Sequence, residues 1–279
     1  MINIIKKFFP KFIKKKILEE LDKNNIFSGW SMQTKTCPPW MYISADNNKN
    51  SALPYFLEIQ KELEDNIKSN YLTLNQFGNK SLEKVIELRW RHYIVALSIK
   101  FAIKEKNEIN LVEAGVADGL TAWFALKVIN KEQKMINKFY LYDSWEKMNE
   151  KYLDKKEYKK IDKFSKNDLE NTKNNLREFS NIEYIKGFIP NVFEDKDIKH
   201  TETCNWLHID LNSSGPTIDT LNFFEKKMLD NGVILFDDFG WVSHELARVE
   251  VEKWCAKRNG ILWPFPTGQA IFFLNKNRY

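Results

Sequence analysis

The stretch that decides the fold is INLVEAGVADGLTAWFALKV, residues 109–128. Its first six residues, 109–114, are mainly apolar and predict a buried strand. Gly115 and Gly119 predict a tight turn, and the apolar run after them predicts a helix over 121–128. A strand, a glycine turn and a helix in this order indicate the first half of a β–α–β unit, which is built on parallel strands.

Short apolar runs alternate with helix-like stretches through the rest of the chain. Four more strands are predicted, at 139–142, 182–185, 206–209 and 232–236. Helices are predicted at 218–228 and 245–257. The segments 261–265 and 270–274 flank Pro266-Thr267-Gly268, which predicts a closing hairpin. We therefore expect an α/β fold, a doubly wound and mostly parallel seven-stranded sheet with a C-terminal antiparallel hairpin.

Residues 1–105 have a helical rather than an alternating pattern, and we assign them to an N-terminal helical extension and lid. Residues 106–279 form the second domain. Apolar residues recur at near-helical spacing over 1–21, and the first sixteen residues hold six lysines and no acid. This pattern favours a helix packed on the protein itself or in a homo-oligomer. The alternative is a helix lying on anionic lipid or on a partner.

Two more N-terminal stretches have a distinct character. Residues 26–53 are rich in turn formers and aromatic residues and predict an ordered loop or flap. Residues 82–104 predict one long helix that carries Arg89, Arg91 and His92 in its middle.

The charge and cysteine content exclude several classes of protein. The net charge is +5, and the N-terminal lysines account for it, so the remaining chain is near neutral. A nucleic-acid groove along the body is therefore not expected. Three distant cysteines imply neither a disulfide framework nor a thiolate zinc site. No apolar run reaches the ~18 residues of a membrane span. We expect a cytoplasmic protein, or one peripheral on the inner membrane face through its basic N-terminus.

Ligands of an open parallel sheet bind beyond the carboxyl ends of its strands, and here those ends are acidic. Glu113 ends the first strand, and Asp118 follows between Gly115 and Gly119. The turn is not G-x-G-x-x-G, and neighbouring acids disfavour a diphosphate. Asp143 ends the second strand, where a carboxylate accepts hydrogen bonds from a ribose diol. A nucleoside that carries a cation fits these features, and S-adenosylmethionine is such a molecule.

Three further acids end the fourth and fifth strands: Asp210, Asp237 and Asp238. Adjacent parallel strands lie ~4.8 Å apart, so these carboxylates are expected to converge. A hard divalent ion, Mg²⁺ or Mn²⁺, would relieve their repulsion. The alternative is that one of the adjacent pair only caps the next helix.

Four stretches, 111–122, 140–146, 187–190 and 207–240, resemble class I S-adenosylmethionine-dependent methyltransferases. The nearest group is the macrocin O-methyltransferase-like family, which modifies sugar hydroxyls on antibiotics and polysaccharides. The most specific motifs are the V-E-x-G-V turn, D-S-W-E and the strand that ends in Asp-Asp. The resemblance covers about 110–274 and implies a Rossmann-like sheet. Ala117-Asp118-Gly119-Leu120 departs from the usual Trp-Arg-Gly-Gly, and Asp210-Leu211-Asn212 departs from Asp-Gly-Asp.

From this resemblance we expect the cofactor to contact Glu113, Gly115, Asp118, Gly119, Asp143, Ser144, Gly187, Phe188 and Asp210. It also implies that Asp210, Asp237 and Asp238 hold Mg²⁺. Asp210 is the first candidate for the base that takes the acceptor's proton, with His244 as a second candidate. His208 lies within a strand pattern and is more typical of a core or supporting histidine.

The function that follows is Mg²⁺-assisted O-methylation of a hydroxyl on a sugar or glycan-type acceptor, such as a surface polysaccharide or a natural product. The aromatic flap at 30–42 and the insert that begins at Glu146 are expected to cover the acceptor. The alternatives are a metal-independent small-molecule methyltransferase and a non-catalytic adapter on the same fold. A nucleic-acid methyltransferase is disfavoured because no Asn-Pro-Pro-Tyr-like element is present.

Overall fold

The structure is a computed structural model that describes residues 53–160, 164–241 and 244–275. The basic amphipathic segment 1–21 and the aromatic flap 30–42 lie outside the described residues. Membrane contact, a homo-oligomer and the flap's role therefore stay predictions. Among the described helices, none is both long and apolar enough to cross a bilayer.

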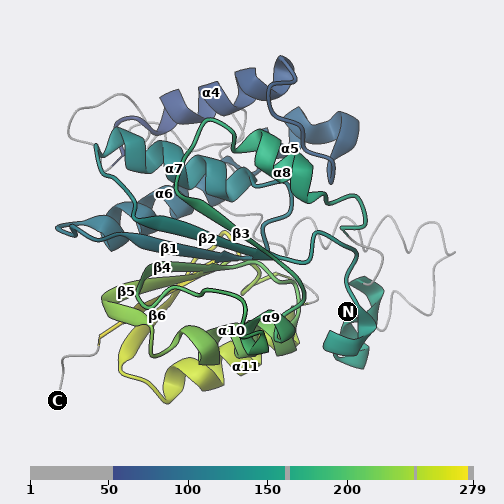
Figure 1. Cartoon of the computed structure of the whole chain (residues 1–279), viewed down its shortest axis with the longest axis vertical. Helices are drawn as coiled ribbons and strands as arrows, with labels where there is room; N and C mark the ends of the chain where they lie inside the picture. The colour runs from purple at the N-terminus through teal and green to yellow at the C-terminus, as the bar shows by residue number, and fades with distance from the viewer. Residues whose placement is uncertain (1–52, 161–163, 242–243, 276–279) are drawn as a thin grey trace, which may run out of the picture.

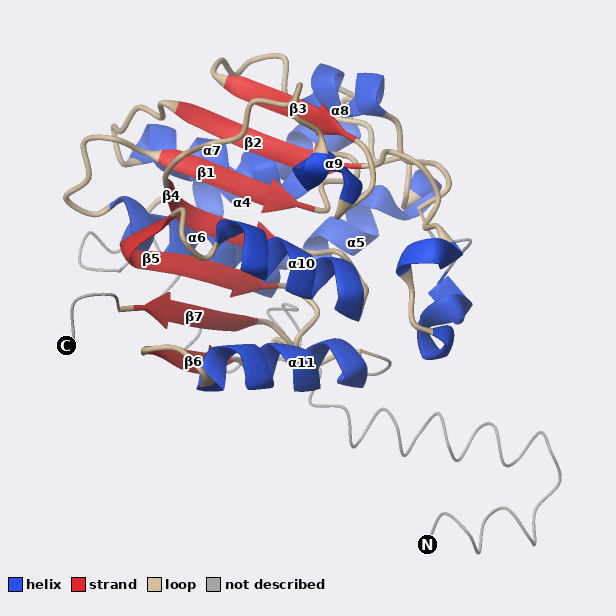
Figure 2. Cartoon of the chain, turned by 60° about the horizontal axis from the view of Figure 1, so that its bottom comes forward, coloured by secondary structure: helices blue, strands red, loops and turns tan. Residues whose placement is uncertain are grey.

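One seven-stranded sheet forms the centre of the molecule, with the strand order β3-β2-β1-β4-β5-β7-β6 (Figure 2). The strands from β1 to β5 pair in parallel, and β7 pairs antiparallel with both β5 and β6. Their bounds are β1 Asn110–Ala114, β2 Lys138–Asp143, β3 Ile182–Lys186, β4 Cys204–Ile209, β5 Met228–Phe236, β6 Gly260–Pro264 and β7 Ala270–Leu274. The predicted Rossmann-like sheet with its C-terminal antiparallel hairpin is confirmed.

Helices cover both faces of the sheet (Figure 1). One layer contains α4 Phe56–Lys68, α5 Ser81–Glu87, α6 Arg89–Ile103, α7 Leu120–Lys131 and α8 Leu169–Asn175. The opposite layer contains α9 Asn191–Glu194, α10 Ser214–Phe224 and α11 Glu245–Ala256. Three short 3-10 helices complete the described elements: η1 Gly78–Lys80, η2 Glu150–Tyr152 and η3 Lys155–Lys160.

Each face of the sheet has its own apolar core. Phe124 and Trp206 are fully buried on the side of α6 and α7, and Tyr142 and Phe224 are fully buried on the side of α10. Burial on both faces explains why the parallel strands are apolar runs rather than alternating ones. The sheet is therefore a rigid support for the residues at its carboxyl edge.

Several boundaries differ from the sequence prediction. The helix predicted over 82–104 is two helices, because Leu88 leaves the helical region with ψ 4° between α5 and α6. The helix predicted to begin at 218 begins at Ser214, and β5 begins at Met228 instead of 232. In its described part, the insert after Glu146 contains η2, η3 and α8.

Candidate active site

A glycine turn connects β1 to α7 and brings the backbone close to β4. Gly115 has φ +86°, and a Cβ at this position would lie 2.0 Å from the carbonyl oxygen of Asp210. Only glycine fits there, because both the conformation and the neighbouring backbone exclude a side chain. Gly119 also has a positive φ, +80°, and precedes α7 directly.

Asp143, the last residue of β2, holds this turn in place. Its Oδ2 accepts hydrogen bonds from the backbone N–H groups of Val116 (2.7 Å) and Ala117 (2.9 Å). Its Oδ1 accepts one from the N–H of Trp145 (2.7 Å). Burial raises the pKa of Asp143, and these three donors act against that rise. The carboxylate thus organises the turn through its own hydrogen bonds.

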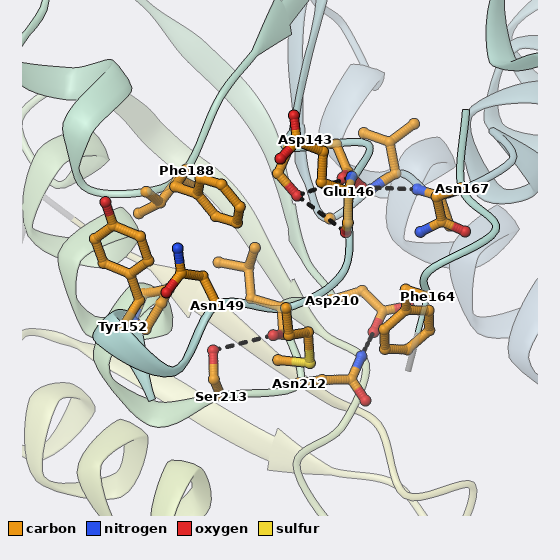
Figure 3. A pocket seen from close by; sticks show the side chains of 18 of the residues that line it. Asp143, Glu146, Asn149, Tyr152, Phe164, Asn167, Phe188, Asp210, Asn212 and Ser213 are labelled. Carbon is orange, nitrogen blue, oxygen red and sulfur yellow. Dashed lines mark hydrogen bonds between the residues drawn. The ribbon is translucent and has the colours of Figure 1, made fainter. Parts of the chain in front are cut away.

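A cavity lies over this turn, with a volume of about 920 Å³ including its open side. The carboxyl edge of the sheet contributes Glu113, Gly115, Asp143, Ser144, Gly187, Phe188 and Asp210. The insert contributes Glu146, Met148, Asn149, Tyr152, Leu153, Phe164 and Asn167. In Figure 3 the labelled residues surround the cavity, with Tyr152, Asn149 and Phe188 on one side and Asp143, Phe164 and Asn167 on the other. The insert is therefore a wall of this cavity.

The insert is attached to the sheet domain by an aromatic and a carboxylate contact. The rings of Tyr152 and Phe188 stack with centroids 5.3 Å apart. Glu157 is 3% exposed and accepts hydrogen bonds from the N–H (2.9 Å) and hydroxyl (3.2 Å) of Ser214, the first residue of α10. A carboxylate at a helix N-terminus is favoured by the helix dipole.

Three acids that line the cavity, Glu113, Asp143 and Asp210, have raised pKa values. Glu113 is 1% exposed, its Oε1 lies 3.0 Å from Nδ1 of His208, and its Oε2 has no hydrogen-bond partner among the described residues. Burial, together with Asp210 and Asp143, raises the pKa of Glu113 well above its usual range. Burial and Asp238 raise the pKa of Asp210 to about 6. Such a site favours a cationic ligand, which would offset these costs.

A second cavity adjoins the first on the side of α6. Both are lined by Gln76, Thr121, Phe164, Asp210 and Asn212. The second cavity is also lined by Arg91, His92, Asp237 and Asp238. Asp210 thus lies where a ligand in one cavity would meet a ligand in the other.

The acid cluster consists of Asp210, Asp237 and Asp238, whose nearest carboxylate oxygens all lie within 4.8 Å of one another. Arg91 of α6 reaches the cluster, with its Nε donating to Oδ1 of Asp237 (2.9 Å). Gln269 Nε2 donates to the same Oδ1 (2.9 Å). The buried Oδ2 of Asp238 accepts no hydrogen bond from the described residues. An all-carboxylate set with an unsatisfied buried oxygen fits a divalent ion such as Mg²⁺.

Most predicted cofactor residues line the first cavity: Glu113, Gly115, Asp143, Ser144, Gly187, Phe188 and Asp210. Asp118 and Gly119 line neither cavity. The Asp118 carboxylate is 0% exposed and accepts from the N–H of Gln76 (3.0 Å) and from Asn171 Nδ2 (2.8 Å). The assignment of Asp118 and Gly119 as cofactor contacts therefore stays a prediction. In the structure, the Asp118 side chain joins the turn to Gln76 and Asn171.

The predicted histidines take different places. His244 precedes α11, lies 3.3 Å from Oδ1 of Asn212 and 3.7 Å from Oδ2 of Asp238, and lines neither cavity. In the structure it lies beside the acid cluster, and its assignment as a second base stays a prediction. His208 is buried against Glu113, and burial lowers its pKa to about 4, as expected of a supporting histidine.

Sequence reasoning gave no role to Arg91 or Gln269, and it expected the insert to cover the acceptor without naming the residues that line the first cavity. Arg91 left one signal, a cation in the middle of a largely apolar helix pattern. Gln269 follows the Pro-Thr-Gly turn, and its partner Asp237 is 32 residues away.

Comparison with known proteins agrees with this geometry. Residues 112–239 match the family model described as a methyltransferase domain. The O-methyltransferase NovP superposes with a TM-score of 0.64 at 14% identity, covering 80% of this chain and 98% of its own. CalS11, described as calicheamicin methyltransferase, gives 0.51 at 11% identity, covering 80% and 93%. No curated protein matches the sequence.

The two solved structures share the fold of this chain. The family match includes the glycine turn at Gly115, the strand ends at Asp143 and Asp210, and the acid cluster. Residues 112–239 therefore resemble a methyltransferase domain, and the chain shares the fold of the O-methyltransferase NovP.

Proposed function

We propose that the protein transfers the methyl group of S-adenosylmethionine to a hydroxyl oxygen of a sugar-type acceptor, with a divalent ion at the acid cluster. The observation that carries the proposal is the meeting of two cavities at Asp210. A methyl donor in the first cavity and an alcohol in the second would approach each other at this carboxylate. Positioning of the two reactants supplies much of the rate of such a transfer.

The first cavity suits the cofactor in charge and shape. Glu113, Asp143 and Asp210 provide negative charge for the sulfonium and the amino group. The turn at Gly115 permits close approach of the backbone. Oδ1 of Asp143 accepts one N–H, so it retains a lone pair for a ribose hydroxyl. The aromatic rings of Phe188 and Tyr152 offer faces for the adenine base.

The second cavity suits a polyhydroxylated acceptor. Gln76, Thr121 and Asn212 supply neutral polar groups beside the acids, while Phe77 and Phe164 supply apolar surface. A sugar has both kinds of surface, because its hydroxyls form hydrogen bonds and its C–H faces pack on aromatic rings. NovP and CalS11 share only the fold with this chain, so the acceptor class rests on these residues.

In the transfer, the acceptor oxygen attacks the methyl carbon, the carbon–sulfur bond breaks, and S-adenosylhomocysteine is left. Asp210 takes the proton of the hydroxyl, since it lines both cavities and its pKa of about 6 leaves it ionised at neutral pH. An ion held by Asp210, Asp237 and Asp238 would orient the hydroxyl and lower its pKa. His244 positions the cluster through Asn212 and Asp238.

The test has two stages. Calorimetry should show that S-adenosylhomocysteine binds, and a screen of nucleotide sugars and glycans should then find an acceptor whose methylation stops in Asp210→Asn. Asp197→Asn, an exposed acid outside both cavities, is the matched control. Absence of S-adenosylhomocysteine binding would favour an adapter on the same fold. If EDTA left the turnover unchanged, methyl transfer would still stand, but the proposed role of a divalent ion would be refuted.

A further inference from the structure

We infer that Arg91 is a resident cation of the acid cluster and competes with a divalent ion for Asp237. The inference rests on the ion site proposed above and goes beyond it, because it assigns a role to a residue of α6. Arg91 would act through Asp237, as a positioning residue.

Arg91 contacts the cluster through one hydrogen bond and two ion pairs. Arg91 Nε donates to Oδ1 of Asp237 at 2.9 Å, and its Nη2 contacts Oδ2 of the same carboxylate. Nη2 also lies 3.6 Å from Oδ2 of Asp210. The hydrogen bond between the guanidinium and the carboxylate is charge-assisted, and such bonds are among the stronger ones in proteins.

This pair uses the oxygens that an ion would need. Oδ1 of Asp237 accepts from both Arg91 and Gln269, and Oδ2 faces the guanidinium. The carboxylate is only 3% exposed, so water does not screen the charges well. An ion coordinated by Asp237 would lie beside a second positive charge, and like charges at this range oppose each other strongly.

The other two acids have no such partner. Asp238 has no ion pair with arginine or lysine among the described residues, and Asp210 has only the 3.6 Å contact. Arg91 therefore neutralises one member of the cluster in the ion-free protein. Ion binding through all three acids requires Arg91 to release Asp237. The side chain lines the second cavity, which gives it room to move.

The same helix provides a matched control. Arg89, two residues earlier, donates to Oε1 of Glu64 through Nε (3.0 Å) and Nη2 (2.6 Å) and lines neither cavity. It is also a partly buried arginine in a carboxylate pair, so its removal costs a similar interaction without changing the charge at the cluster.

The experiment measures Mn²⁺ binding by calorimetry and by electron paramagnetic resonance for wild type, Arg91→Gln, Arg91→Lys and Arg89→Gln. Removing a nearby like charge should tighten binding by about tenfold or more in Arg91→Gln. Arg91→Lys should remain nearer to wild type, and Arg89→Gln should match it. In the wild type, adding Mg²⁺ should also shift the side-chain Nε–H signal of Arg91 in an ¹⁵N spectrum.

S-adenosylhomocysteine binding by each variant shows that it is folded. Equal or weaker Mn²⁺ binding by folded Arg91→Gln would overturn the inference while the proposed ion site stands. Binding by Arg91→Gln but not by wild type would support it. Absence of Mn²⁺ binding in both would overturn the ion site and the inference together, leaving methyl transfer untouched. If Arg91→Gln does not fold, a shift of the Arg91 signal in wild type supports the inference and its absence overturns it.

Discussion

Replacing Gly115 with alanine should destabilise the protein far more than the same change at Gly119. Both residues have positive φ, +86° and +80°, so both variants incur the left-handed conformation's cost of about 1–2 kcal/mol. At Gly115 the new Cβ would also lie 2.0 Å from the oxygen and 2.6 Å from the carbon of the Asp210 carbonyl group. Overpacking of this kind adds about 1–3 kcal/mol. At Gly119 the atom nearest to the new Cβ would be Thr172 Cγ2 at 3.1 Å, and a small movement of the Thr172 side chain can relieve this close contact.

Urea unfolding of the two variants measures the difference directly. We expect a loss of about 2–5 kcal/mol for Gly115→Ala and about 1–2 kcal/mol for Gly119→Ala. Because relief of the clash would displace the end of β4, cofactor affinity should also fall more for Gly115→Ala. Equal free energies of unfolding for the two variants would refute the argument that β4 backbone, rather than the turn's conformation alone, requires glycine at 115.

Three other predictions concern buried polar groups. Asp143→Asn should weaken S-adenosylhomocysteine binding by tenfold or more in calorimetry, because an amide has one acceptor oxygen and its NH₂ group must then face either the N–H of Trp145 or those of Val116 and Ala117; unchanged affinity would contradict this. Glu157→Gln should speed cofactor dissociation in stopped-flow measurements, since the insert loses its charged anchor at Ser214, whereas exposed Glu150→Gln should not. Burial lowers the pKa of His92 from 6.5 to about 3, so the unfolded state takes up this proton first as the pH falls. From pH 7 to pH 5 this group should reduce the free energy of unfolding by about 2 kcal/mol, and His92→Gln should remove that part of the loss.

The sequence was sufficient to predict those strands that are buried on both faces of the sheet. Strands such as β1 and β4 are buried on both sides, so their residues form apolar runs that stand out from helices. Their acidic ends were also visible, because a carboxylate directly after such a run is placed at the sheet edge by chain geometry alone. Asp210, Asp237 and Asp238 therefore converge as predicted.

What the sequence did not predict depends on contacts between distant segments. Arg91 and Asp237 are 146 positions apart, and helical periodicity does not say which strand end the start of α6 will face. The break at Leu88 was missed because the apolar spacing continues through it. Asp143 was expected to face a ligand, and its position at the strand end could not show that three backbone N–H groups already point to it.

The support of the glycine turn also bears on the division of the chain at about residue 105. The Asp118 carboxylate accepts from the N–H of Gln76, and its backbone carbonyl accepts from Asn175 Nδ2. The side chain of Asn175 also accepts from the N–H of Thr73. The segment before α5 is therefore hydrogen-bonded to the back of the turn whose front lines the cofactor cavity. A chain trimmed to residues 106–279 would leave the buried acid with fewer donors, and a buried carboxylate without partners is costly. Loss of cofactor binding in such a fragment would thus reflect a distorted turn, even if residues 1–105 never touch the cofactor's reacting atoms.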